Sequence, residues 1–406
     1  MKKLSLITAT LLLPFALNAK MIPNQQIEIT PSPNVSPIVI PDILKPTDIK
    51  EDAQQSPFIR TGPTVQLAIL LDTSGSMNGL INQTRSQIWK IINEISKANK
   101  DNKGITLQVA LYEYGKSTIS KYEGFSKMLV PLTNDLDLLS EKLFSLNTNG
   151  GEEYSGMTIK KAVDDLQWSN HKDDLKLIII AGNESFEQGN IPYSYAINKA
   201  KNKNIIVNTI FCGNNNNGIN LKWSDGAKLG GGKYMNIEQD RQIVYVKTPY
   251  DTQIQNLNIQ LNNTYISYGS KGMLKKSKQL EQDKASKEIN EEVAIERSIA
   301  KASANYQADS WDIVSFSNSG NQVADEMLSE SKSEIFNDKD LNERKEIVKK
   351  AKNDREKITK EINELRKKRE AYINKEKKNK DDKTDLGSVL IKNIKDVLKK
   401  NEFEIQ

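Results

Sequence analysis

The chain has 406 residues, of which 37% are hydrophobic and 27% charged, with a formal net charge of +5. This hydrophobic content lies below the usual 45–50%, so we expect one well-packed domain beside more solvated segments. With Cys212 as the one cysteine, an intramolecular disulfide framework is excluded. With His171 as the one histidine, most Ser-His-Asp triads and multi-histidine zinc sites are excluded as well.

The first residues predict a secretory signal peptide. Met1–Lys3 carries positive charge, Leu4–Leu17 is apolar, and Ala19 supplies a small residue at a cleavage point. The apolar run is shorter than the roughly 20 residues of a membrane-spanning helix, although an uncleaved membrane anchor is the alternative. We expect residues 1–19 to be removed and the mature protein to be soluble, either periplasmic or secreted.

Residues 20–63 predict a linker. This stretch holds eight of the twelve prolines in the chain, and proline favours extended, semi-rigid backbone. Its apolar residues between Ile38 and Leu44 leave open that it docks as an edge strand.

The middle of the chain alternates between predicted strands and helices. Val65–Leu71, Leu175–Ala181 and Ile205–Phe211 are nearly continuous apolar runs, as in strands buried on both faces. Helical spacing of apolar residues occurs between them, for example from Ile88 to Ile95. This order predicts an α/β fold with a doubly wound, mostly parallel sheet, in which ligands bind at the carboxyl ends of the strands.

The loop after the first predicted strand has the composition of a metal site. It reads Asp72-Thr73-Ser74-Gly75-Ser76-Met77, so one carboxylate and alternating hydroxyls follow directly on a buried strand. Hard oxygen donors of this kind suit Mg²⁺ or a similar cation such as Mn²⁺. The alternative is a polar turn that caps the next helix.

The segment DTSGSM resembles the metal-ion-dependent adhesion site of the von Willebrand factor A domain, and NGGEEYSG, IIIAGNESFEQGNIPY and NTIFCG extend the resemblance to an exported bacterial subgroup. The resemblance covers about residues 64–268. It implies that Asp72, Ser74 and Ser76 ligate a divalent metal. It also implies that the metal binds an oxygen of a protein partner.

Two loops depart from the family pattern. Where the family has Thr or an acid, this chain has Glu152-Glu153, and the resemblance places Glu153 at that position with Glu152 as the alternative. Where the family has Asp, this chain has Asn183. Two carboxylates, Asp72 and Glu153, would neutralise a divalent ion and weaken its attraction for an acidic ligand.

Other motifs predict structural roles. Gly230-Gly231-Gly232-Lys233 lacks the spacing of a phosphate-binding loop and predicts a tight turn before a strand at Tyr234–Ile237. We expect Cys212 in the core and His171 in solvent. Trp223 falls in a polar stretch near the predicted ligand edge, where we expect it, with Tyr154, to lie close to a bound partner.

Residues 269–406 predict a helical, partly coiled-coil-like basic region. Residues 341–380 contain sixteen Lys and Arg and eight Asp and Glu, a net charge of +8. Apolar residues recur at spacings of three and four, with two arginines in the same seam. The seam comprises Val348, Ala351, Arg355, Ile358, Ile362, Leu365, Arg369 and Tyr372. An intramolecular hairpin, a homo-oligomeric coiled coil and a disordered basic segment are the alternatives, and Leu386–Leu398 predicts a final amphipathic helix.

Two classes of function follow from these features. The first is an exported, metal-dependent protein-interaction module. The second is a structural or assembly factor of the cell envelope, in which the helical region acts and the metal only stabilises the fold. We expect no enzyme, because no nucleophile–base pair is apparent, and no nucleic-acid partner, because of the export signal. The basic helix could contact anionic envelope surfaces.

Overall fold

The computed structural model describes residues 62–237, 245–379 and 386–405, and within 377–379 and 386–389 the backbone alone. The predicted signal peptide and nearly all of the predicted linker therefore lie outside the described residues. The described residues form one compact unit. None of the helices in the described ranges combines the length and hydropathy that crossing a bilayer requires.

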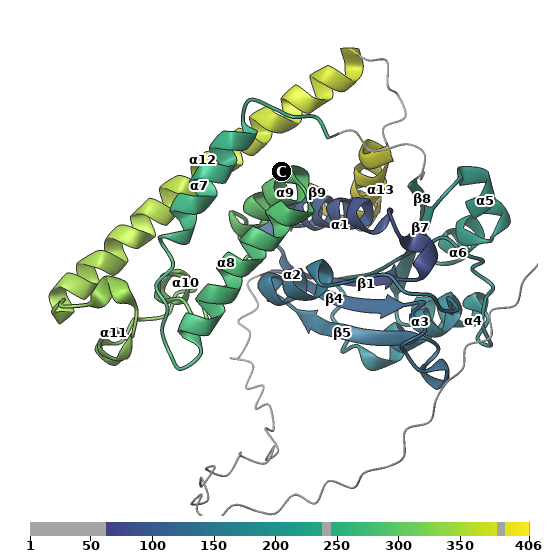
Figure 1. Cartoon of the computed structure of the whole chain (residues 1–406), viewed down its shortest axis with the longest axis horizontal. Helices are drawn as coiled ribbons and strands as arrows, with labels where there is room; N and C mark the ends of the chain where they lie inside the picture. Colours follow the sequence, from purple (N-terminus) through teal and green to yellow (C-terminus); the bar gives the residue numbers. More distant parts are fainter. Residues whose placement is uncertain (1–61, 238–244, 380–385, 406) are drawn as a thin grey trace, which may run out of the picture. The chain divides into compact units, whose positions relative to one another are not determined.

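The centre of this unit is a six-stranded sheet with the strand order β5-β4-β1-β6-β7-β8 (Figure 1). β5 runs antiparallel to β4, whereas the remaining neighbours are parallel, so the predicted doubly wound α/β fold is confirmed. The strands are β1 (Thr64–Asp72), β4 (Thr106–Tyr114), β5 (Ser126–Thr133), β6 (Leu175–Gly182), β7 (Ile205–Cys212) and β8 (Gly231–Ile237).

Both faces of the sheet are buried, which explains the apolar runs. Every residue of β1 and of β6 is buried. Alternate residues of β1 enter different cores: Leu67 and Ile69 pack on one face, and Ala68 and Leu70 on the other. The helices of this part are α1 (Ile81–Ile95), α2 (Leu136–Phe144), α3 (Ser155–Asp165), α4 (Tyr193–Asn202), α5 (Asn215–Asn220) and α6 (Trp223–Leu229), with short 3₁₀ turns η1 (Gly75–Met77) and η2 (Lys121–Glu123).

The C-terminal part is helical, as predicted. Its elements are α7 (Asp251–Asn262), α8 (Gly272–Ile289), α9 (Glu291–Lys301), α10 (Ile313–Asn318), α11 (Asp325–Glu330), η3 (Glu334–Phe336), α12 (Leu341–Asn379) and α13 (Leu386–Lys400). α8 and α9 pack on α2 and α1, and α13 lies beside α1 and β8 (Figure 1). A small second sheet, β3-β2-β9, joins β2 (Ala98–Lys100) and β3 (Lys103–Gly104) to the C-terminal β9 (Glu404–Ile405).

The seam residues of α12 pack against other helices of the same chain. Ile358, Ile362 and Leu365 pack in one apolar cluster with residues of α7 and α9. The two seam arginines are also buried: Arg355 lies 2.6 Å from Asp312, and Arg369 bonds to carboxylates of α7 and α9. The structure therefore contains the intramolecular alternative, and this packing covers the surface that a homo-oligomeric coiled coil would need.

Candidate metal centre

The candidate metal residues meet at the carboxyl edge of the sheet. Asp72 is the last residue of β1 and lies opposite Tyr114, the last residue of β4. The next loop is tied to β4, because the Thr73 N–H and hydroxyl both donate to the Tyr114 carbonyl, at 2.8 and 3.0 Å. Asn183 follows directly on β6. Parallel strands thus bring side chains more than 100 residues apart to one edge.

The hydroxyls of the DTSGSM loop form a chain of hydrogen bonds. Asp72 is fully buried, and its Oδ1 accepts from the Ser74 N–H at 2.7 Å, a local turn typical of aspartate. Ser74 Oγ and Ser76 Oγ lie 2.8 Å apart. Ser76 Oγ also donates to Asn183 Oδ1 at 3.0 Å, so four of the five predicted residues are linked directly.

The two glutamates of the second loop lie in different environments. Glu153 is 4% exposed, and its N–H donates to Gln188 Oε1 at 2.7 Å. Glu152 instead is exposed and accepts a hydrogen bond from the Tyr154 hydroxyl. The structure therefore places Glu153, and not Glu152, with the other candidate residues.

Gly115 marks the point where these side chains converge. A Cβ at this position would lie 2.7 Å from Asp72 Oδ1, 3.0 Å from Glu153 Cγ and 3.2 Å from Ser74 Cβ. Glycine is favoured here because a side chain would collide with these residues. Its φ of +84° is also a conformation that other residues rarely adopt. Sequence analysis did not identify Gly115; its signal is a glycine directly after a predicted strand of the same sheet.

The two carboxylates have incomplete hydrogen bonding. Asp72 Oδ2 and Glu153 Oε2 are buried and have no hydrogen-bond partner among the described residues. Burial raises the pKa of Asp72 to about 6. Burial, together with the charge of Asp72, raises the pKa of Glu153 to about 9. Both shifts favour a proton on this pair as long as no cation is bound.

These observations fit a hard divalent cation. It would occupy the place of the shared proton, satisfy the two free carboxylate oxygens and suit the neighbouring serine hydroxyls. Among the described residues, no group of three or more His, Cys, Asp and Glu side chains could hold a metal ion. The candidate centre is consistent with this finding, because it combines two carboxylates with serine and asparagine oxygens.

Trp223 lies near the candidate metal centre, as expected, since a Cβ at Gly182 would lie 3.0 Å from the Trp223 ring and 3.1 Å from Asp72 Oδ2. The expected contact of Trp223 with a partner is wrong, because this side chain is buried. Trp223 begins α6, is 1% exposed and packs against Phe186 with ring centroids 4.7 Å apart. Its indole N–H donates to the Glu184 carbonyl at 2.7 Å, which fixes the loop after Asn183. Tyr154 is only half-buried and lies edge-on to Phe125, so it remains available at this edge.

The remaining motifs have structural roles. The predicted strand at Tyr234–Ile237 is present, but β8 already begins at Gly231, so only Gly230, the C-cap of α6, lies in the turn. Cys212 is buried at the end of β7, and burial raises the pKa of its thiol to about 12. His171 lies in an exposed loop.

Comparison with known proteins gives one family. The family model described as von Willebrand factor type A domain matches residues 66–222. No curated protein matches the chain.

Solved structures that match part of the chain include BatB from Bacteroides thetaiotaomicron, a conserved hypothetical protein that is 17% identical. That alignment covers 43% of this chain and 90% of BatB, with a TM-score of 0.33. Proximal thread matrix protein 1 from the mussel byssus, with a zinc-occupied MIDAS motif, is 12% identical over 45% of this chain and 44% of its own, with a TM-score of 0.33. The pilus adhesin SpaC from Lactobacillus rhamnosus GG is 12% identical over 45% of this chain and 29% of its own, also with a TM-score of 0.33. Because the sequence identities and TM-scores are low, none of these three structures indicates what this chain binds.

Proposed function

Residues 66–222 belong to the von Willebrand factor type A family, and we propose that the chain is an exported protein-binding module that depends on a divalent cation. In this proposal Asp72, Ser74 and Ser76 hold the metal, and Glu153 and Asn183 contribute directly or through water. The metal supplies an open coordination position for an oxygen atom of the partner. We propose Mg²⁺ as the bound cation, with Mn²⁺ as the alternative, since all the donor atoms are hard oxygens.

The observation that carries this proposal is the pair of adjacent, buried carboxyl groups, each with one oxygen that no neighbouring donor satisfies. Asp72 Oδ2 and Glu153 Oε2 belong to residues that are 0% and 4% exposed. Burying two adjacent carboxyl groups without compensation is costly, and a bound cation removes most of this cost. A turn that merely capped a helix would need one carboxylate and would leave no such pair.

The charge of the site bears on the kind of partner. Asp72 and Glu153 together balance the two charges of a divalent ion. Glu184, which is exposed, adds its negative charge and contributes to the raised pKa of Glu153. A partner carboxylate would therefore be attracted less strongly than at a site with one acidic ligand. Carbonyl, amide and hydroxyl oxygens of a partner are correspondingly more competitive.

The test compares metal binding and partner capture by the full chain. Mn²⁺ and Mg²⁺ binding is measured by titration calorimetry for the unaltered protein, for Asp72→Ala and for Asp173→Ala. Asp173 is the matched control, because it is a half-exposed aspartate in the loop before β6. We expect Asp72→Ala to abolish metal binding and Asp173→Ala to leave it unchanged. Equal binding by both variants would contradict the proposed site.

The same three proteins are then used to capture partners from an exported fraction, with Mg²⁺ and with EDTA. Capture that is lost in EDTA and in Asp72→Ala supports the proposed function.

The strong positive charge of residues 341–380 favours a second candidate, a structural or assembly factor that holds anionic polymers of the cell envelope. Binding of that kind would survive EDTA and the Asp72→Ala change. It would weaken as salt increases, because salt screens exposed charges.

A further inference from the structure

A buried lysine contacts a carboxamide where three helices of the C-terminal part meet. Lys301 ends α9, Asn262 ends α7, and Asp283 lies on α8. These residues are 3%, 9% and 8% exposed, and the side chain of Lys301 is fully enclosed. Lys301 Nζ donates to Asn262 Oδ1 and, at 2.7 Å, to Asp283 Oδ2. The lysine amine is therefore held against the side-chain amide of another helix.

Asp283 binds both of these groups through one oxygen atom. Its Oδ2 accepts from Asn262 Nδ2 at 2.8 Å as well as from Lys301 Nζ, while its Oδ1 accepts from Arg297 Nε at 2.8 Å. An ionised carboxylate can only accept, so Asn262 must direct its nitrogen to Asp283 and its oxygen to Lys301. One carboxylate oxygen is thus in hydrogen-bond contact with the lysine amine and with the amide nitrogen.

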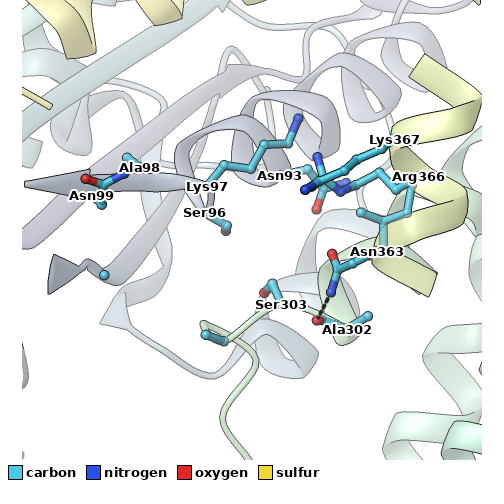
Figure 2. A pocket seen from close by; sticks show the side chains of 13 residues that line it. Asn93, Ser96, Lys97, Ala98, Asn99, Ala302, Ser303, Asn363, Arg366 and Lys367 are labelled. Atoms are coloured by element: carbon cyan, nitrogen blue, oxygen red, sulfur yellow. Dashed lines mark hydrogen bonds between the residues drawn. The ribbon is translucent and has the colours of Figure 1, made fainter. Parts of the chain in front are cut away.

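The surroundings make the Lys301 amine a better nucleophile than an exposed lysine. Burial lowers its pKa to about 8, against the attraction of Asp283 and with the help of the Arg297 charge. The neutral amine, which forms more readily at a lowered pKa, is the reactive form. The end of α9 is also fixed, because Asn363 of α12 donates to the Ala302 carbonyl at 3.1 Å (Figure 2). Amine and amide are therefore kept together in one orientation, which favours a reaction between them.

We propose that Lys301 and Asn262 form an intramolecular isopeptide bond, in which Asp283 transfers the proton. Lys301 reacts as the neutral amine, after its ammonium proton has passed to solvent. Its Nζ attacks Cγ of Asn262, and Asp283 Oδ2 takes a proton from Nζ and gives it to Nδ2. The Cγ–Nδ2 bond then breaks and ammonia leaves. The products are one amide cross-link and one molecule of ammonia, so no oxidant or cofactor is consumed, and Arg297 remains as the counter-charge of Asp283.

The cross-link joins the end of α7 to the end of α9. An intramolecular disulfide cannot do this, because Cys212 is the one cysteine of the chain. Like a disulfide, the bond restricts the unfolded chain and so stabilises the folded state. Unlike a disulfide, it is not broken by reducing agents.

Mass spectrometry of the purified full chain tests this inference. We expect the intact mass to be lower, by one molecule of ammonia, than the mass calculated from the amino-acid sequence. After unfolding and digestion with trypsin, residues 248–271 and 298–332 should appear as one branched peptide, because trypsin does not cleave after an acylated lysine. Fragmentation must place the branch at Lys301 and Asn262, since an asparagine that cyclises also loses ammonia but forms no cross-link.

Two adjacent asparagines provide the matched variants. Asn262→Ala removes the amide that is attacked, whereas Asn263→Ala changes the exposed residue next to it. We expect the branched peptide to be lost in Asn262→Ala and kept in Asn263→Ala. Asp283→Asn should also lose it, with circular dichroism used to show that the variants fold.

The unaltered protein decides the question even where a variant fails to fold. Separate, unmodified peptides from it would overturn the proposal. So would a branch at Asn258, whose Nδ2 also donates to Asp283 Oδ2, at 2.9 Å.

Discussion

Arg297 of α9 donates from Nη2 to Asp137 Oδ1 of α2 at 2.7 Å, which joins the C-terminal helices to the sheet-containing part by a buried ion pair. Arg297 is 1% exposed, and its Nε also bonds to Asp283 of α8 at 2.8 Å. Since a buried guanidinium needs its counter-charges, this contact forms only when α2, α8 and α9 are all in place. The two parts of the chain are therefore expected to unfold together.

Replacing Arg297 by methionine tests this coupling. The change keeps much of the side-chain volume but leaves Asp137 and Asp283 without one of their cations. We expect the free energy of unfolding to fall by about 3–5 kcal/mol, the cost of breaking a buried pair. Chemical denaturation followed by circular dichroism measures it. Lys284→Ala, which removes a highly exposed partner of Glu288, is the control and should cost less than about 0.5 kcal/mol. Similar losses for both variants would show that the buried pair has no special role.

The proposed metal ligands can be tested by comparing variants of Glu153 and Glu152, which are adjacent and chemically identical. Glu153 lies beside Asp72 with a free buried oxygen, whereas Glu152 is exposed and bound to Tyr154. We expect Glu153→Gln to weaken Mg²⁺ and Mn²⁺ binding at least about tenfold, because ligand charge sets affinity at such sites. Glu152→Gln should leave it nearly unchanged. Titration calorimetry decides; a stronger effect of Glu152→Gln would remove Glu153 from the site.

The sheet and the first part of the metal loop could be predicted because their signals are local. Val65–Leu71 and Leu175–Ala181 are apolar on both faces, and Asp72, Ser74 and Ser76 stand within five residues of each other. The choice of Glu153 rather than Glu152 as a metal ligand rests on the resemblance to the family. The residues alone cannot decide it, because two adjacent glutamates differ only in the direction of their side chains. The burial of Trp223 could not be predicted, because its sequence neighbours are polar and it is buried by Phe186, a contact between distant loops.

The β2–β3–β9 sheet could not be predicted for a similar reason. Its strands have two or three residues, too few for a period-two pattern to appear. Ala98 pairs with Ile405 across about three-quarters of the chain, and no local signal encodes that pairing.

Acid should destabilise the buried cluster around Asp283. Burial alone would raise the pKa of this carboxyl, but the charges of Lys301 and Arg297 outweigh it and hold the pKa below its usual value. A depressed folded-state pKa means that the stabilisation is complete above the unfolded value of about 4 and is lost as pH falls through the lower folded value. We expect the urea concentration at the unfolding midpoint to decrease as the pH is lowered below 4. This decrease should be less steep in Asp283→Asn. Identical pH profiles for the two proteins would exclude Asp283 as the source.

The last prediction concerns α13, which packs beside α1 and β8 although it is far from both in the sequence. Leu390, Ile394 and Leu398 are at most 1% exposed and belong to the same core cluster as Leu67 of β1. A fragment that ended near residue 268 would lack α13 and α9, and would expose this apolar surface of α1.

We therefore expect the fragment of residues 64–268 to be much less stable than the full chain, whatever its metal content. In the full chain, Ile394→Ala should lower the free energy of unfolding by about 2–5 kcal/mol, as for other buried isoleucines. Lys399→Ala, an exposed position on the same helix, is the control and should change it by less than about 0.5 kcal/mol. Denaturant unfolding of the full chain, the fragment and the two variants measures these differences. If the 64–268 fragment unfolds at the same midpoint as the full chain, then α13 contributes nothing to this core and the sheet-containing part is an independent unit.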